Sequence, residues 1–197
     1  RALAQNPTVT ALDVQENRIS DSGAESLADA LTINGALKTL NLGNNFVQAE
    51  GAQFLAEALK DNESLTSLNL SGNNIDHYGA SYLAEACASF NRTLRSLNLA
   101  GNNLRCAGAA HFGLLEIRHS ELINLDLSQN ELGDQGAEVL AIMLRVNHTL
   151  QTLLLRSNHI GPRGTMALAT SLATRNSSLT SLDLSDNRLG DDGAEQL

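Results

Sequence analysis

Three side chains that could bind a metal ion or act as a nucleophile recur at nearly equal spacing. His77, Cys106 and Asp134 are separated by 29 and 28 residues. Histidine, cysteine and aspartate are the usual ligands of zinc, and a thiol beside a base is a common nucleophile. The three residues occupy the same position of a repeating unit, so stacked units would bring them together. Only three ligands would be present, however, and nothing in the sequence supplies an oxyanion hole. We therefore interpret them as solvated loop residues and predict no metal site.

No motif of enzyme chemistry or phosphate binding stands elsewhere in the chain. The glycines never form G-x-x-x-x-G-K-S/T, whose backbone N–H groups would cradle phosphates. No G-x-S-x-G sequence marks a serine nucleophile. We therefore predict that the protein is not an enzyme, has no catalytic residues and needs no cofactor.

Four N-x-S/T sequences begin at Asn62, Asn91, Asn147 and Asn176. In a secreted protein, such sequences would accept N-linked glycans. All four stand at the same point of the repeating unit, where an Asn ends a predicted helix and a polar turn follows. Together with Asn34, they are interpreted as helix-ending residues and not as a sign of secretion.

Charge and cysteine content narrow the range of partners. The 197 residues carry a net charge of −9, with 13 Lys and Arg against 22 Asp and Glu. Nucleic acids and anionic membranes require a cationic face, so we expect neither as a partner. No apolar run approaches the roughly 20 residues of a membrane span. Two cysteines, Cys87 and Cys106, make no disulfide framework, which favours a reducing compartment such as the cytoplasm.

A nine-residue pattern repeats along the whole chain. The pattern L-x-x-L-x-L-x-x-N, with Val twice replacing Leu in the first copy, starts at residues 9, 37, 65, 94, 122, 150 and 179. Alternation of leucines predicts a short strand with Leu facing a core. The ninth residue is always Asn, and its amide can satisfy loop backbone groups in its own and the next repeat. This Asn column consists of Asn17, Asn45, Asn73, Asn102, Asn130, Asn158 and Asn187.

A glycine and an amphipathic segment follow each Asn of the column. Leu and Ala at spacing i, i+1 and i+4 predict a helix with one apolar face. The fourth copy differs, because Gly113 and Glu116 stand where Ala and Leu are expected. We expect that helix to shift so that it buries Ile117. The glycines are Gly23, Gly51, Gly79, Gly108, Gly136, Gly164 and Gly193.

The repeated pattern resembles the leucine-rich repeat, and its length of 28 or 29 residues resembles the ribonuclease-inhibitor-like class. The resemblance implies an α/β solenoid, or horseshoe, with a parallel β-sheet on the concave side and α-helices on the convex side. Strands about 4.8 Å apart and helices about 8–10 Å apart cannot stack without such curvature. We expect residues 1–197 to form a single array whose two ends are uncapped, as in a piece of a longer chain.

Binding residues of such an array are expected where its copies differ, because the shared pattern only builds the scaffold. The fifth position of each copy, on the predicted concave face, is Asn or Asp except in the sixth copy, which has Leu154. Arg156 and His159 lie beside this exposed apolar residue. At the other end, Asp13, Glu16 and Arg18 form a mixed charged patch with Lys38. The candidate partner-binding residues are Asp13, Glu16, Asp126, Leu154, Arg156, His159, Asp183 and Asp186.

The resemblance implies a protein-interaction module, as in the repeat arms of intracellular NOD-like receptors and bacterial effectors. An acidic surface suits a basic protein partner, through electrostatic steering. A GTPase activator of the Ran-activating type is an alternative, for which Arg18 and Arg188 are the candidate arginines. A structural scaffold piece within a large assembly is a second alternative.

Overall fold

The computed structural model describes residues 2–113 and 120–197, in which short strands alternate with helices. The strands are β1 (Ala11–Asp13), β2 (Thr39–Asn41), β3 (Ser67–Asn69), β4 (Ser96–Asn98), β5 (Asn124–Asp126), β6 (Thr152–Leu154) and β7 (Ser181–Asp183). The helices are α1 (Asp21–Leu31), α2 (Ala49–Asp61), α3 (Asp76–Glu85), α4 (Arg105–Phe112), α5 (Gly133–Leu144), α6 (Pro162–Thr174) and α7 (Gly190–Ala194). A 3-10 helix, η1 (Leu3–Gln5), precedes β1, and a π-helix, η2 (Ala86–Phe90), continues α3.

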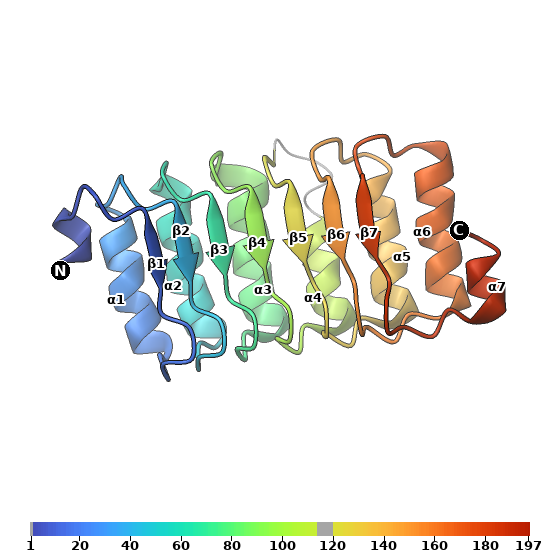
Figure 1. Cartoon of the computed structure of the whole chain (residues 1–197), viewed down its shortest axis with the longest axis horizontal. Coiled ribbons are helices and arrows are strands. Elements are labelled where there is room, and N and C mark those ends of the chain that lie inside the picture. Colours follow the sequence, from blue (N-terminus) through green and yellow to red (C-terminus); the bar gives the residue numbers. More distant parts are fainter. Residues whose placement is uncertain (1, 114–119) are drawn as a thin grey trace.

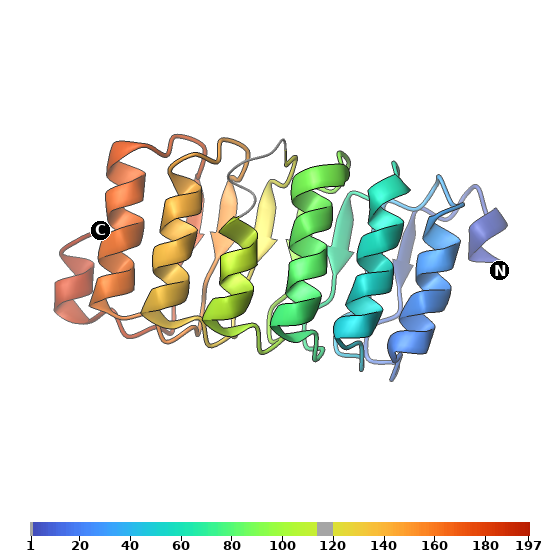
Figure 2. The same ribbon diagram turned by 180° about the vertical axis from the view of Figure 1, so that it is seen from behind.

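The strands form one parallel sheet in chain order, with each strand paired to the next. The register is the same throughout, so that the middle leucine of each strand faces the middle leucine of its neighbour. The helices cover one face of the sheet and leave the other uncovered (Figures 1 and 2). We call the uncovered side, the predicted concave side, the open face. The predicted α/β solenoid with a parallel sheet is therefore confirmed.

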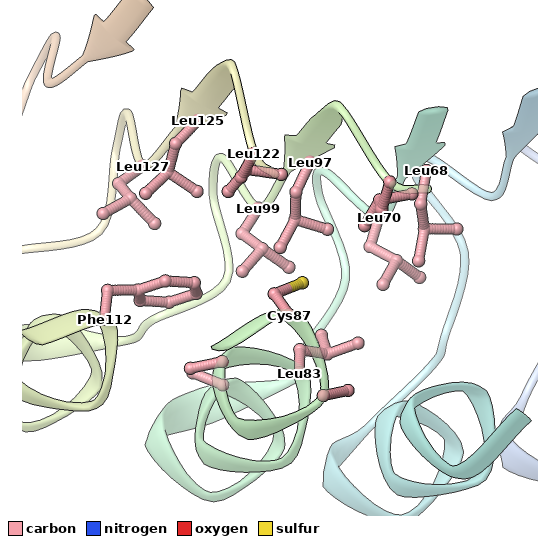
Figure 3. Packing of buried hydrophobic residues seen from close by; sticks show 14 of the residues in the cluster. Leu68, Leu70, Leu83, Cys87, Leu97, Leu99, Phe112, Leu122, Leu125 and Leu127 are labelled. Carbon is pink, nitrogen blue, oxygen red and sulfur yellow. The ribbon is translucent and has the colours of Figure 1, made fainter. Parts of the chain in front are cut away.

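The core lies between the sheet and the helices. Figure 3 shows Leu97 and Leu99 pointing from the strand side toward Leu83 and Cys87 on the helix side. All four side chains are at most 3% exposed, as is Phe112, which replaces the first helix leucine in α4. Burying such a side chain contributes about 1.5–3 kcal/mol. Burial also raises the pKa of the Cys87 thiol to about 12, so this thiol stays protonated inside the core.

The glycine of each repeat allows the helix to begin against its neighbours. A Cβ atom on Gly164 would lie 2.8 Å from Asp134 Oδ1 and 2.9 Å from both Ala137 Cβ and Ile160 Cγ2. Carbon atoms do not approach neighbours so closely without strain. The glycine column is therefore explained by packing at the start of each helix.

The Asn column links successive repeats through backbone groups of the loops. Asn130 Oδ1 accepts hydrogen bonds from the backbone N–H groups of Asn102 and Leu104, at 2.9 and 3.2 Å. Its Nδ2 donates to the carbonyl oxygens of Leu99, Leu127 and Ser128. Asn130 is completely buried, so these bonds satisfy groups that water cannot reach.

The direction of these links differs from the prediction. From Asn45 onward, each Asn of the column reaches its own repeat and the preceding one, not the next one. Asn158 Oδ1, for example, accepts from the backbone N–H groups of Asn130 and Leu132 in the repeat before it. The strand–loop path brings the carbonyl and N–H groups of the earlier repeat in front of the later amide, an offset that the sequence does not reveal.

A second Asn column lies at the ends of the helices. Asn62 Nδ2 donates to the carbonyl oxygens of Leu31 and Asn34 in the preceding repeat, and its Oδ1 accepts from the N–H groups of Ser64 and Leu65. Asn91 makes the same set of bonds one repeat later. Both side chains are buried, at 5% and 3% exposure. These N-x-S/T residues are therefore structural in the folded protein, as the sequence indicated.

The two 29-residue repeats place their extra residue at the end of the helix. In the repeats of 28 residues that end their helix with Asn34, Asn62 or Asn147, this Asn donates its backbone N–H to the carbonyl four residues earlier, as Asn62 does to Ala58. In the 29-residue repeats the bond spans five residues, from Asn91 to Ala86 and from Asn176 to Ser171. This wider, π-type turn keeps the second Asn column in register despite the insertion.

Helix α4 ends at Phe112 with Gly113 as its C-cap, while Glu116 and Ile117, on which the predicted helix shift depends, lie outside the described residues. Within the described ranges, no helix combines the length and the apolar character needed to span a bilayer.

We predict that Asn130→Ala lowers the free energy of unfolding by at least about 3 kcal/mol. The change leaves several buried N–H and C=O groups unpaired, each at a cost of about 1–3 kcal/mol. Urea denaturation monitored by circular dichroism measures the effect. Asn17→Ala is the matched control, because Asn17 is exposed and its side chain donates only to the Gln15 carbonyl. Equal losses of unfolding free energy in the two variants would contradict the role of the Asn column in linking the repeats.

Candidate functional site

His77, Cys106 and Asp134 lie in the first turns of α3, α4 and α5 and not in loops as predicted, and they do not form a ligand cluster. Asp134 Oδ1 accepts hydrogen bonds from the backbone N–H groups of Gly161 and Gly164, at 2.7 and 2.9 Å, and so caps the N-terminus of α6 from the preceding repeat. The ring of His77 packs instead on Tyr78. Over the described ranges, no three His, Cys, Asp or Glu side chains come together as metal ligands would.

The cap that Asp134 provides recurs at the other end of the chain. Asp21 Oδ1 accepts from the backbone N–H groups of Gln48 and Gly51, at 2.7 and 2.9 Å, at the start of α2. A carboxylate at a helix N-terminus also interacts favourably with the helix dipole. The two aspartates therefore have a structural role that the sequence pattern did not indicate.

The fifth position of each repeat has a hydrogen-bonding role on the open face. In six repeats its Asn or Asp oxygen accepts from the backbone N–H two residues later, and so closes the end of the strand with an Asx turn. Asn98 Oδ1 accepts from Ala100 in this way, and Asp126 Oδ1 accepts from Ser128, both at 2.9 Å. The other four acceptors are Asp13, Asn41, Asn69 and Asp183.

Leu154 is the exception, because its side chain cannot accept a hydrogen bond. The N–H group of Arg156, two residues later, consequently has no acceptor among the residues that the structure describes. Leu154 stands between Asp126 on β5 and Asp183 on β7 in the register of the sheet. The sixth repeat thus replaces a local hydrogen bond with an apolar side chain and an available N–H donor.

A hollow on the open face lies beside this residue. Its volume is about 160 Å³, and it extends over β4, β5 and β6. Leu154 is half-buried there and adds apolar surface to a wall of mixed polar and apolar residues. The lining residues are Ser96, Leu97, Asn98, Asn124, Leu125, Asp126, Thr152 and Leu154.

Charged groups lie beside Leu154 on the side of the last repeat. Arg156 pairs with Asp186, with Nη2–Oδ2 and Nε–Oδ2 distances of 2.6 and 2.8 Å. Hydrogen bonding by Ser185 lowers the pKa of Asp183, with a smaller contribution from the charge of Arg156. Asp183 is therefore expected to be ionised near neutral pH. His159 is exposed in the loop after β6, in the left-handed backbone region with a φ angle of 59°.

The predicted residues divide into two places on the structure. Asp126, Leu154, Arg156, Asp183 and Asp186 lie on or next to β5, β6 and β7, and we call these five residues the β6 patch. Asp13 and Glu16 lie at β1, at the far end of the sheet (Figure 1). The Asp13 carboxylate already accepts from Asn41 Nδ2 at 3.0 Å. The candidate residues therefore do not form a single site.

The two arginines proposed for a GTPase activator are also far apart. Arg18 follows β1 and Arg188 follows β7, and both side chains are exposed. Separated by the length of the sheet, they cannot act on the same bound nucleotide.

The chain matches a family model in sequence and a solved structure in fold. A family model described as "Leucine Rich repeat" matches residues 5–28, 36–56, 61–84, 90–111, 122–141, 146–169 and 175–197. No curated protein sequence matches the chain. Among solved structures, the chain is similar to "Leiomodin-1 Actin-Binding Site 2 (ABS2)", with a TM-score of 0.57 and 21% identity over 87% of this chain and 83% of that one.

We predict that Leu154→Asn is more stable than Leu154→Ala by about 1 kcal/mol. Both variants lose the leucine methyl groups, but only Asn can accept the N–H of Arg156 and restore the Asx turn. Urea denaturation of the two purified variants provides the comparison. Equal unfolding free energies would mean that this N–H group is not available in the parent protein.

Proposed function

Because the chain belongs to the leucine-rich repeat family, we propose that it is a protein-interaction module and that the β6 patch, with the hollow beside it, is its contact site. The family match covers all seven repeats of the solenoid. Proteins built from such repeats present extended surfaces to partners, and the sites lie where individual repeats depart from the shared pattern.

The replacement at Leu154 is the observation that carries this proposal. The other six repeats use the fifth position for an Asx turn. The repeat that contains Leu154 lacks that hydrogen bond, although the position lies on the open face. A half-buried aliphatic group in a hollow of about 160 Å³ is a suitable contact for an apolar side chain of a partner. The free N–H group of Arg156 can donate to a carbonyl oxygen of the same partner.

The charges around Leu154 define the chemistry of that partner. Asp126 and Asp183 flank Leu154 on the two neighbouring strands. The net charge of −9 also favours the approach of a basic protein. We propose a partner that presents an aliphatic side chain next to Lys or Arg residues, and neither a nucleic acid nor a membrane.

Actin is the first named protein to test as this partner. The similar structure of leiomodin-1 is titled an actin-binding site. At 21% identity the similarity concerns the fold, so actin enters as a candidate for the proposed surface. Cosedimentation with actin filaments and gel filtration with actin monomers examine it directly.

The proposed module acts by binding and not by chemistry, in a reducing, cytoplasmic compartment. Its two cysteines are unpaired, with Cys87 buried in the core and Cys106 partly exposed. No contact among the described residues favours the GTPase-activating or scaffold alternatives over this proposal.

We expect the parent protein to form a photo-crosslinked product with its partner through the open face, and we expect this product to decrease when Leu154 is changed. A photoreactive amino acid at the exposed Ser181 on β7 samples the surface beside the hollow. The Leu154→Asn variant should reduce the crosslinked product at least tenfold, because it removes the apolar contact and occupies the N–H of Arg156. Quantitative mass spectrometry of native lysate, with purified actin in parallel, measures the product.

Met166→Asn is the matched control for this experiment. Met166 is also an exposed apolar side chain, at 51%, but it lies on α6 in the helix layer. It should leave crosslinking at Ser181 unchanged. Products that survive Leu154→Asn, or that are lost equally with Met166→Asn, would place the contact outside the β6 patch.

A further inference from the structure

A second hollow lies in the helix layer, where α5 and α6 end. Its volume is about 290 Å³, and it is lined by Ile142, Arg145, Val146 and Arg175. The two helices are neighbours, gold and orange in Figure 2, on the side away from the open face. Ile142 and Val146 are 55% and 43% exposed, so the hollow presents apolar surface to solvent between two cationic side chains. We call it the α5–α6 hollow.

The sequence around this hollow departs from the charge of the rest of the chain. Residues 139–182 contain none of the 22 acidic residues but include four arginines: Arg145, Arg156, Arg163 and Arg175. Two of the four find acidic partners outside this stretch, because Arg156 pairs with Asp186 and Arg163 with Glu138. Arg145 and Arg175 make no ion pair with any residue in the described part of the chain. The hollow is therefore a cationic site in an acidic protein.

The same place three repeats earlier shows how the chain closes such a hollow. Counted from the glycine of each repeat, Glu57 and Lys60 on α2 correspond to Ile142 and Arg145, and Phe90 after α3 corresponds to Arg175. Lys60 Nζ lies 2.7 Å from Glu57 Oε1 and 5.1 Å from the centre of the Phe90 ring. The cation there is satisfied by a carboxylate and an aromatic ring from the chain itself.

The stability of α5 and α6 explains the two arginines of the α5–α6 hollow but not its exposed aliphatic side chains. Arg145 and Arg175 are the C-caps of α5 and α6, where a positive charge interacts favourably with the helix dipole. That interaction does not require exposed aliphatic neighbours. At the positions of Ile142 in the first three helices the chain has Asp29, Glu57 and Glu85, as expected for a solvated helix face.

We propose that the α5–α6 hollow binds an acidic segment of a partner protein that carries an aromatic side chain. The carboxylates pair with Arg145 and Arg175, whose guanidinium groups form two-point hydrogen bonds with carboxylates and stack on rings. The ring packs on Ile142 and Val146. The partner thus supplies the carboxylate and the ring that Glu57 and Phe90 supply at the corresponding place between α2 and α3.

This binding site is independent of the one on the open face. The two surfaces lie on opposite layers of the solenoid and have opposite charge preferences. Leu154→Asn should therefore leave the affinity of the α5–α6 hollow unchanged, so that failure of either proposal can be recognised separately.

A fluorescein-labelled peptide with a central Phe between Glu residues is the probe. Fluorescence polarisation with the full chain should show saturable binding that weakens as the salt concentration rises. In a methyl-labelled sample, the NMR signals of Ile142 and Val146 should shift on addition of the peptide, while that of the fully buried Ile75 stays in place.

Ile142→Glu is the decisive variant, and Met166→Glu is its control. The new carboxylate stands three residues before Arg145, as Glu57 stands before Lys60, and so closes the hollow from within. We expect at least tenfold weaker peptide binding with an unchanged circular dichroism spectrum and unfolding midpoint, because Ile142 is exposed. Met166→Glu introduces the same charge on α6 outside the hollow and should change the affinity less than twofold.

Four results would overturn the proposal. The first is the absence of binding up to the solubility limit of the peptide, and the second is equal affinity for a peptide with Gln in place of Glu. The third is an equal loss of affinity in Ile142→Glu and Met166→Glu. The fourth is self-association of the parent, detected by sedimentation and abolished by Ile142→Glu, which would identify a second copy of the chain as the occupant.

Discussion

The structure depends on satisfying backbone groups in loops that belong to no regular ladder. Each repeat has only three strand residues, so the N–H and C=O groups of the loops that join strand and helix must find partners elsewhere. Two columns of asparagine provide them, one after the strands and one after the helices, and both reach into the preceding repeat. Asn130 and Asn62 are therefore connections between repeats as much as parts of their own. Hydrophobic burial holds the sheet and helices together, but these amides fix the offset at which one repeat stacks on the next.

At the candidate binding surface, one of the local hydrogen bonds that the other repeats form is missing. Along the rest of the open face, the Asx turns satisfy the backbone N–H group at the end of each strand, so these N–H groups are not available to bind a partner. At Leu154 the turn is missing, so an aliphatic side chain and a backbone donor become available together. The helix layer follows the same principle, since the Glu57–Lys60–Phe90 group is closed on itself whereas Ile142, Arg145 and Arg175 are not. In both places, comparison with the other repeats shows which interaction is missing: the Asx turn at Leu154, and the carboxylate and aromatic ring at the α5–α6 hollow.

The sequence alone predicted the elements that depend on local pattern. All seven strands, their order and the inward leucines followed from the spacing of residues such as Leu97 and Leu125, because burial and strand periodicity are readable within nine residues. The roles of Asp21 and Asp134 did not follow, because the N–H groups that they cap lie 27 to 30 residues away. The predicted direction of the links made by the Asn column was wrong for the same reason. The exceptional character of Leu154 was visible in the sequence, but its physical meaning required the hydrogen bonds of the other six repeats.

The wider turn at the end of α3 and α6 separates two properties that repeat proteins usually couple. Because an additional residue is absorbed between Ala86 and Asn91 without displacing the Asn that follows, repeat length can vary while the stacking period stays constant. Repeats of 28 and 29 residues are then interchangeable building blocks. A lineage can duplicate, delete or exchange them without a phase error, and the helix-to-strand junction is where small insertions can accumulate and diversify the outer edge of the solenoid.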